Sequence, residues 1–130
     1  MNTQETDYSE LLAEIADAEE ENKLKARSYN ESELFLINAI IEGAGYPLKK
    51  AITIVLNDQL ELYKGITEMA EVAYHDYKEQ KSGAVADMDG FSLELVYELE
   101  RYVDWYRWGL ELQKESNYIW SNKGIIKINN

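Results

Sequence analysis

The sequence predicts an all-α fold, a bundle of four to five helices that ends in a short C-terminal β-hairpin. Two observations lead to this fold class: apolar residues recur every three or four positions through most of the chain, and after Ser116 short β-rich segments flank Gly124. The chain has 130 residues. This length fits a single helical domain, residues 1–130, that can bury about two-thirds of its unfolded surface.

The first predicted helix is strongly acidic. Thr6 or Asp7 can cap it, and eight acidic residues precede Lys23, the first basic residue. The acids at its C-terminal end are Asp17, Glu19, Glu20 and Glu21. Such a run predicts either a solvated helix face or a docking surface for a basic partner.

The second predicted helix begins after Asn30, which forms a capping-box pattern with Glu33. Its apolar residues cover most of its circumference, and the Gly43–Gly45 pair ends it. This pattern is typical of a central, mostly buried helix.

A third helix begins at Tyr46–Leu48, where the only proline, Pro47, favours a helix start. The apolar stride continues in phase to Tyr77 across Gly65, which favours one long helix, although a break at Gly65 stays open. The β-branched residues 52–55 could form a strand, but their phase with the following residues favours a helix.

The last predicted helix, Phe91–Ser116, is the longest amphipathic run of the chain. One arc of it predicts a core face: Leu95, Val96, Leu99, Tyr102, Val103, Tyr106 and Leu110. A second set lies beside and behind that arc: Tyr97, Arg101, Trp105, Trp108 and Leu112. Because Trp, Tyr and Arg are enriched at protein interfaces, this set predicts a partner-binding surface, a second copy of the chain included, unless the chain itself covers it.

Composition limits the partners of this chain. The net charge of −12 disfavours direct binding to nucleic acid or to anionic membranes and favours a protein partner with a basic surface. The absence of cysteine excludes disulfides and thiolate chemistry, and with no apolar stretch of membrane-spanning length we expect a cytoplasmic protein.

A calcium loop and a nucleophilic site both lack support. Asp87, Asp89 and Gly90 resemble the middle of an EF-hand loop, but Val85 and Val96 would occupy its first and last ligand positions. We therefore expect Asp89 or Ser92 to cap the last helix. With no cysteine and one histidine, nucleophile and base pairs have no pattern here.

Metal chemistry has one weak pattern. The single histidine, His75, cannot supply the two Glu-x-x-His motifs of a di-iron bundle. The spacings Glu14-x-x-Asp17 and Glu68-x-x-Glu71 match those of an all-α, metal-dependent nucleotide pyrophosphohydrolase, but they also arise freely among 25 acidic residues. This enzyme is the alternative interpretation, and a structural homo-oligomer is a third.

Together these observations predict a non-enzymatic acidic inhibitor without cofactor or metal, which masks a basic surface of a nuclease or another nucleic-acid-handling protein. Anti-defence proteins of the anti-CRISPR kind and immunity proteins against nuclease toxins are analogies drawn from size, acidity and the lack of catalytic groups. In such a complex, charge complementarity speeds the encounter and aromatic side chains hold the contact.

Overall fold

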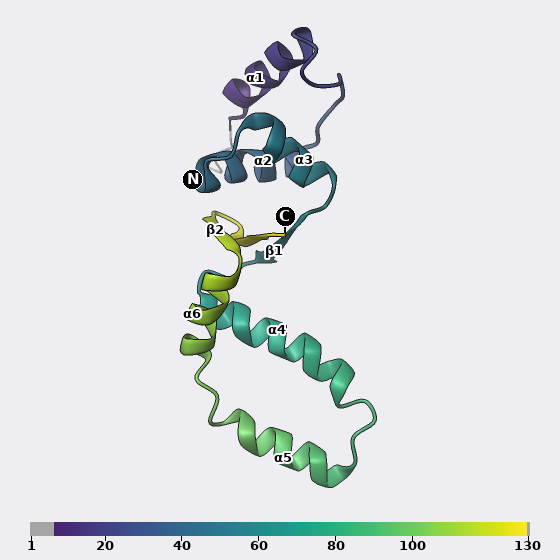
Figure 1. The fold of residues 1–130 in the computed structure, drawn as a ribbon, viewed down its shortest axis with the longest axis vertical. Coiled ribbons are helices and arrows are strands. Elements are labelled where there is room, and N and C mark those ends of the chain that lie inside the picture. Colours follow the sequence, from purple (N-terminus) through teal and green to yellow (C-terminus); the bar gives the residue numbers. More distant parts are fainter. Residues whose placement is uncertain (1–6, 130) are drawn as a thin grey trace, which may run out of the picture. The chain divides into compact units, whose positions relative to one another are not determined.

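A computed structural model describes residues 7–129, and this part of the chain is mostly helical (Figure 1). The helices are α1 (Ser9–Glu20), α2 (Glu31–Ala44), α3 (Leu48–Leu56), α4 (Met69–Ala84), α5 (Gly90–Glu100) and α6 (Trp105–Glu115), and the strands are β1 (Leu60–Lys64), β2 (Asn117–Ser121) and β3 (Gly124–Ile128). The predicted hairpin, β2–β3, is present but belongs to an antiparallel sheet of order β1-β3-β2. No described helix is long and apolar enough to cross a membrane.

The described chain divides into two compact units. The first comprises residues 7–61 with 128–129, and the second comprises residues 62–127. The single domain expected from chain length stays a prediction.

The first unit is built on α2, whose start and end match the predicted caps. The Asn30 side chain accepts a hydrogen bond from Glu33 N (2.8 Å), and the Glu33 carboxylate accepts one from Asn30 N (3.0 Å). At the other end Gly45 adopts φ 71°, a conformation that glycine enters without strain. α2 packs against α3, and the buried side chains include Ile37, Ile40 and Ile54.

The prediction of one long middle helix is wrong. Residues 52–55 are helical as expected, but α3 ends at Leu56, and Asp58 follows with φ 57°. The chain then forms β1, which lies next to β3 in the sheet. Directly beside the two strands, Gly65 N donates to Lys123 O (2.8 Å) and Ile125 N donates to Ile66 O (2.9 Å). Pairing with a strand about 60 residues later outweighs the local helical phase.

The core of the second unit lies between its sheet and α4. The buried residues of this cluster are Tyr63, Met69, Val72, Tyr118 and Ile125, with Ile66 and Leu112 packed against them. α6 packs on α4 at very short range. A Cβ atom at Gly109 would lie 2.6 Å from the carbonyl carbon of Met69, so only glycine permits this approach.

The single helix predicted for Phe91–Ser116 is also wrong, because the chain breaks between Glu100 and Trp105. Asp104 has extended backbone, and its side chain accepts a hydrogen bond from Arg107 N (3.0 Å), which caps α6. The change of direction at this cap separates α5 from α6 (Figure 1), so a face counted along one straight helix does not exist.

This cap gives a first expected result. Replacing Asp104 with alanine should lower the free energy of unfolding by about 1 kcal/mol, because the first turn of α6 loses its acceptor. Replacing it with asparagine should preserve most of the stability, because the amide oxygen can still accept from Arg107 N. Urea denaturation followed by circular dichroism measures both variants, and equal losses for the two would contradict a capping role.

Candidate functional site

One side of α1 forms an exposed acidic surface of the first unit. Leu11 and Ile15 are the buried residues of this helix. Glu10, Glu14 and Asp17 follow one another at helical spacing on its exposed side, and we call these three residues the acidic row. Asp17 was predicted as a partner-binding residue, whereas Glu10 and Glu14 were counted in the acidic run, and Glu14 also in the spacing of the alternative hydrolase.

The predicted acids at the end of α1 fall into two groups. Glu19 accepts a hydrogen bond from Arg27 N (3.1 Å), and Glu21 pairs with Lys23 (2.8 Å), whose ammonium group lowers the pKa of Glu21. Asp17 and Glu20 are exposed and make no side-chain hydrogen bond or ion pair with residues 7–129. Glu19 and Glu21 therefore hold the following loop, and Asp17 and Glu20 keep their charge available.

Helix α4 covers the two tryptophans of the predicted aromatic surface. Trp105 and Trp108 stack on each other with ring centroids 5.4 Å apart. The rings of Tyr74 and Tyr77 lie 5.0 and 5.2 Å from that of Trp105, and partial desolvation raises the pKa of Tyr77. Both tryptophans are thereby half-buried.

The other predicted members of this set lie in different surroundings. Tyr97 is exposed, and the Lys81 ammonium group lies 4.4 Å from the centre of its ring. Arg101 pairs with Glu98 on the surface (3.6 Å), whereas Leu112 packs on the core cluster of the second unit. The structure therefore does not join the five predicted residues into one exposed patch.

The predicted core face is the largest correction. Its members Leu95, Leu99, Tyr102, Tyr106 and Leu110 are all exposed, and α5 has no buried residue at all. The arc was counted along one helix, but the break before Asp104 turns α6 so that its tryptophan side meets α4. The chain therefore exposes the side of α5 that was expected to be buried.

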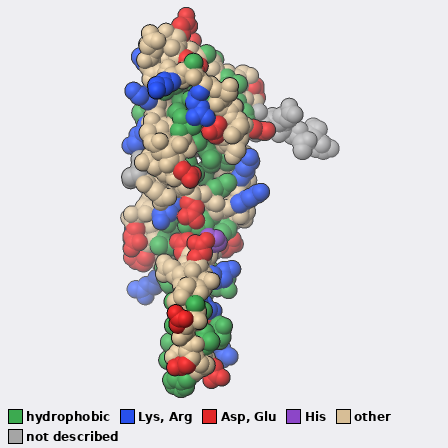
Figure 2. Space-filling view, turned by 90° about the vertical axis from the view of Figure 1, so that its right-hand side faces the viewer, with side chains coloured by type: hydrophobic (Ala, Val, Ile, Leu, Met, Phe, Trp, Pro, Cys, Tyr) green, Lys and Arg blue, Asp and Glu red, His purple; other side chains and the backbone are tan. Residues whose placement is uncertain are grey.

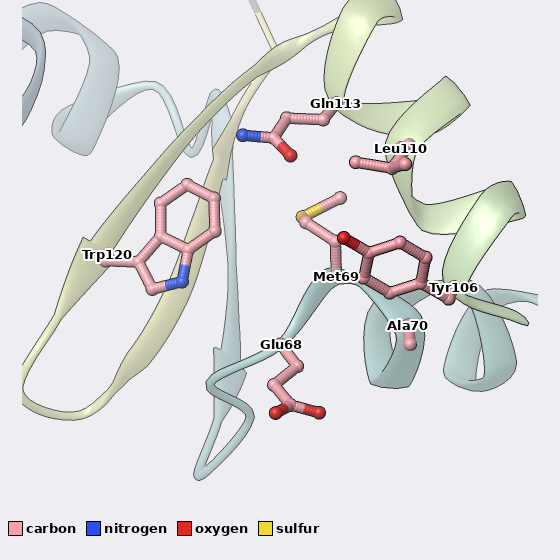
Figure 3. Close-up of a pocket in the computed structure, with 7 residues that line it drawn as sticks. All are labelled: Glu68, Met69, Ala70, Tyr106, Leu110, Gln113 and Trp120. Carbon is pink, nitrogen blue, oxygen red and sulfur yellow. The ribbon is translucent and has the colours of Figure 1, made fainter.

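A pocket lies between α4, α6 and β2 (Figure 3). Its volume is about 280 Å³, and the side chains of Met69, Tyr106, Leu110 and Trp120 line most of it. The indole Nε1 of Trp120 donates to Thr67 O (2.9 Å) and so fixes this wall. Glu68 is the only carboxylate of the lining. The pocket lacks the converging polar groups of an enzyme site.

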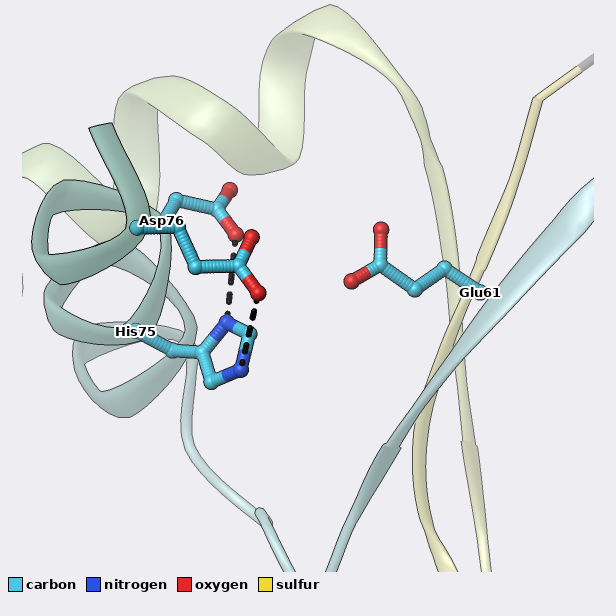
Figure 4. A group of neighbouring side chains, drawn as sticks. Glu61, His75 and Asp76 are labelled. Carbon is cyan, nitrogen blue, oxygen red and sulfur yellow. Dashed lines mark ion pairs between the residues drawn. The ribbon is translucent and has the colours of Figure 1, made fainter. Parts of the chain in front are cut away.

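His75 lies between two carboxylates of its own helix (Figure 4). Its Nδ1 is 3.6 Å from Asp76 Oδ1, and its Nε2 is 3.7 Å from Glu79 Oε1. Tyr63 donates a hydrogen bond to the same Asp76 oxygen (2.9 Å), and its ring meets His75 edge-on. Each ring nitrogen lies near a different carboxylate but beyond hydrogen-bond distance, so the hydrogen bond from Tyr63 to Asp76 is the contact of this group that joins Tyr63 to α4.

The other residues named in the sequence motifs lie at or near the starts of helices. Asp89 caps α5 as predicted, accepting a hydrogen bond from Ser92 N (2.7 Å) that lowers the pKa of Asp89. Glu68 precedes α4, and Glu71 is exposed in the first turn of that helix. Thr6, a predicted cap, lies outside the described residues. The other predicted cap, Asp7, is not the N-cap of α1, because Tyr8 holds that position; Asp7 accepts a hydrogen bond from Ser9 N (2.9 Å) just before it.

The chain matches no protein-family model, and no curated protein is significantly similar to it.

Proposed function

We propose that this chain is a non-enzymatic acidic protein that binds and inhibits a partner by masking a basic surface. The partner class is a nuclease or another nucleic-acid-handling protein, because these proteins carry clefts of positive charge for phosphates. Anti-defence proteins and immunity proteins against nuclease toxins act in this way. The observation that carries the proposal is the charge at the C-terminal end of α1.

That charge opposes the helix it lies on. The C-terminal end of a helix carries a partial negative charge, so acids there cost roughly 0.3–1 kcal/mol each and basic residues are favoured. The last turn of α1 contains Glu19 and Glu20, Glu21 follows at the C-cap, and the turn has no basic residue. A role in folding does not account for Glu20, whereas a basic partner does.

The acidic row suits such a partner. Its carboxylates, Glu10, Glu14 and Asp17, recur about once per helical turn, close to every 5.4 Å along the axis. A cleft whose lysines and arginines are spaced for successive phosphates can pair with carboxylates in a similar row. The row also attracts a basic surface over distance and so speeds association at low salt.

Of the predicted aromatic set, Tyr97 and Arg101 expose their side chains, but the cationic Arg101 does not favour contact with a basic surface. Trp105 and Trp108 contribute in this proposal only through the edges that α4 leaves accessible. The acidic surface is therefore the main recognition element, and the aromatic side chains are secondary.

The test begins with capture of the partner from the native host, followed by affinity measurements with purified proteins. We expect the dissociation constant to rise steeply with ionic strength. Glu14→Gln, Asp17→Asn and Glu20→Gln together should weaken binding at least about tenfold, chiefly through slower association. The same variant should unfold at an equal or slightly higher temperature, because Glu20 opposes the helix dipole.

The matched control is Glu71→Gln, Asp87→Asn and Glu115→Gln, three exposed acids of the second unit. Both triple variants change the net charge from −12 to −9, so a general charge effect would weaken them equally. A dissociation constant that does not change with ionic strength, or an affinity that falls equally in both triple variants, would contradict the proposal. We also expect the nucleic acid that the partner binds to compete with this chain for the partner's basic surface.

A further inference from the structure

The exposed side of α5 carries a continuous apolar stripe. Phe91, Leu95 and Leu99 of α5 and Tyr102, in the turn directly after the helix, follow at spacings of four, four and three residues, and we call them the α5 ridge. Phe91 is 78% exposed and Tyr102 is 77% exposed, while the two leucines are about half exposed. Figure 2 shows hydrophobic side chains at the surface of the lower end of the view, where α5 lies.

The ridge faces away from the rest of its unit. Glu100 forms an ion pair with Lys81 of α4, a contact that raises the pKa of Lys81, and Tyr97 lies against the same ammonium group. These residues occupy the opposite side of α5 from the ridge. An isolated helix of 11 residues is marginal in water and normally depends on buried side chains for its stability. α5 has no buried residue.

The charges beside the ridge identify its partner. Glu94 lies in α5 and Arg101 at its C-cap, seven residues apart and therefore on the same side of the helix axis; within one chain Arg101 pairs with Glu98 (3.6 Å). When two identical helices pack antiparallel about a two-fold axis, the same flanks meet, so Arg101 of each copy reaches Glu94 of the other. We propose that α5 is the interface of a homodimer in which two copies pack this helix antiparallel, ridge on ridge.

The register that pairs Glu94 with Arg101 also interlocks the ridges. In this register Leu95 of one copy lies beside Leu99 of the other, and Phe91 lies beside Tyr102. With 150–250 Å² for a whole aromatic side chain, the ridge offers roughly 500 Å² per copy, hence about 1,000 Å² for the pair. That area is close to the minimum of about 1,000 Å² for a biological interface and is typical of a weak dimer.

A second copy fits better than a different protein for two reasons. The apolar ridge of α5 is exposed whenever the chain is folded. Other copies of the same chain are available wherever the protein is made. A basic partner would also meet Arg101 at the ridge, whereas this flank, with Glu94 and Arg101, is complementary to itself. The dimer does not rest on the proposed inhibitory function.

The first test is the mass of the full chain by sedimentation equilibrium over a range of concentrations. We expect twice the 15.1 kDa of the chain at high concentration. Leu95→Glu should weaken the dimer at least about a hundredfold, because two buried carboxylates would lack partners. Leu12→Glu is the matched control: Leu12 is 47% exposed on α1, against 49% for Leu95, and its substitution should leave the dimer intact.

The second test separates this dimer from any other and does not depend on the stability of a Leu95 variant. Glu94→Arg or Arg101→Glu alone should weaken the dimer about tenfold, since each creates two like-charge pairs, and both changes together should restore it. Because the chain has no cysteine, Glu98→Cys should form an interchain disulfide near the two-fold axis, whereas Glu111→Cys on α6 should not.

A chain that stays monomeric at every concentration would overturn the proposal. So would a dimer that survives Leu95→Glu, or one in which the double charge exchange fails to restore association.

Discussion

Replacing Gly109 with alanine is expected to disrupt the packing of α6 on α4 and to lower the free energy of unfolding by about 3 kcal/mol. The added methyl group would lie 2.6 Å from the carbonyl carbon of Met69, 2.7 Å from its oxygen and 2.8 Å from Ala70 N. These are backbone atoms, so no side chain can turn aside, and α6 must move as a whole. The gain in helix propensity from glycine to alanine, about 1 kcal/mol, does not offset this.

Urea denaturation followed by tryptophan fluorescence measures the effect, because Trp105 and Trp108 of α6 stack beside α4. Gly83→Ala is the matched control, since Gly83 is a helical residue of α4 with open space where the methyl group would be placed. That variant should be as stable as the original chain or more stable. A Gly109→Ala variant of unchanged stability would contradict the close approach of the two helices.

Gly124→Ala should be at least as damaging, with an expected loss of about 3 kcal/mol or more. The residue adopts φ 139°, where only glycine is relaxed, and a Cβ atom there would lie 2.1 Å from Tyr63 O. The substitution therefore combines backbone strain with a collision between β3 and β1. We expect loss of the sheet, with strand signals lost and the core around Ile125 opened.

Gly65→Ala separates these two causes. Gly65 also has positive φ, 78°, but a Cβ atom there would meet nothing within 4 Å. It should therefore cost only the strain, about 1 kcal/mol. Equal losses at Gly65 and Gly124 would mean that the two strands are not packed as closely as described; thermal denaturation of both variants decides this.

Local signals predicted the first part of the chain well. The capping box of Asn30 and Glu33 and the glycine stop after α2 depend on residues within four positions of each other, and both are present. The terminal strands β2 and β3 were predicted from an equally local signal, the short turn before Gly124, but they belong to a three-stranded sheet and not to a separate hairpin. In patterns of this kind, the residues that interact are neighbours in the sequence, so the sequence alone is enough to predict the structure.

The errors arose where distant residues decide. Residues 60–64 fit the helical spacing of apolar residues, but in the fold they pair with β3. The residues around positions 60–64 give no sign of that strand, because it lies near the end of the chain. The break at Asp104 did have a local signal, a capping residue, which the unbroken apolar phase concealed. For the candidate site, the acidic row could be counted from the sequence, whereas the covering of Trp105 depends on Tyr74 and Tyr77 of another helix.

The direct packing of α6 on α4 has a consequence for residues 85–104. Because the two helices contact each other without α5 between them, this segment is a loop that contains α5, and the packing of α4 on α6 holds its two ends together. The entropy of closing such a loop grows only with the logarithm of its length, so insertions in the connection between α4 and α5 cost the α4–α6 packing little. The connection at residues 85–88 can therefore change in length while α4, α5 and α6 keep their contacts.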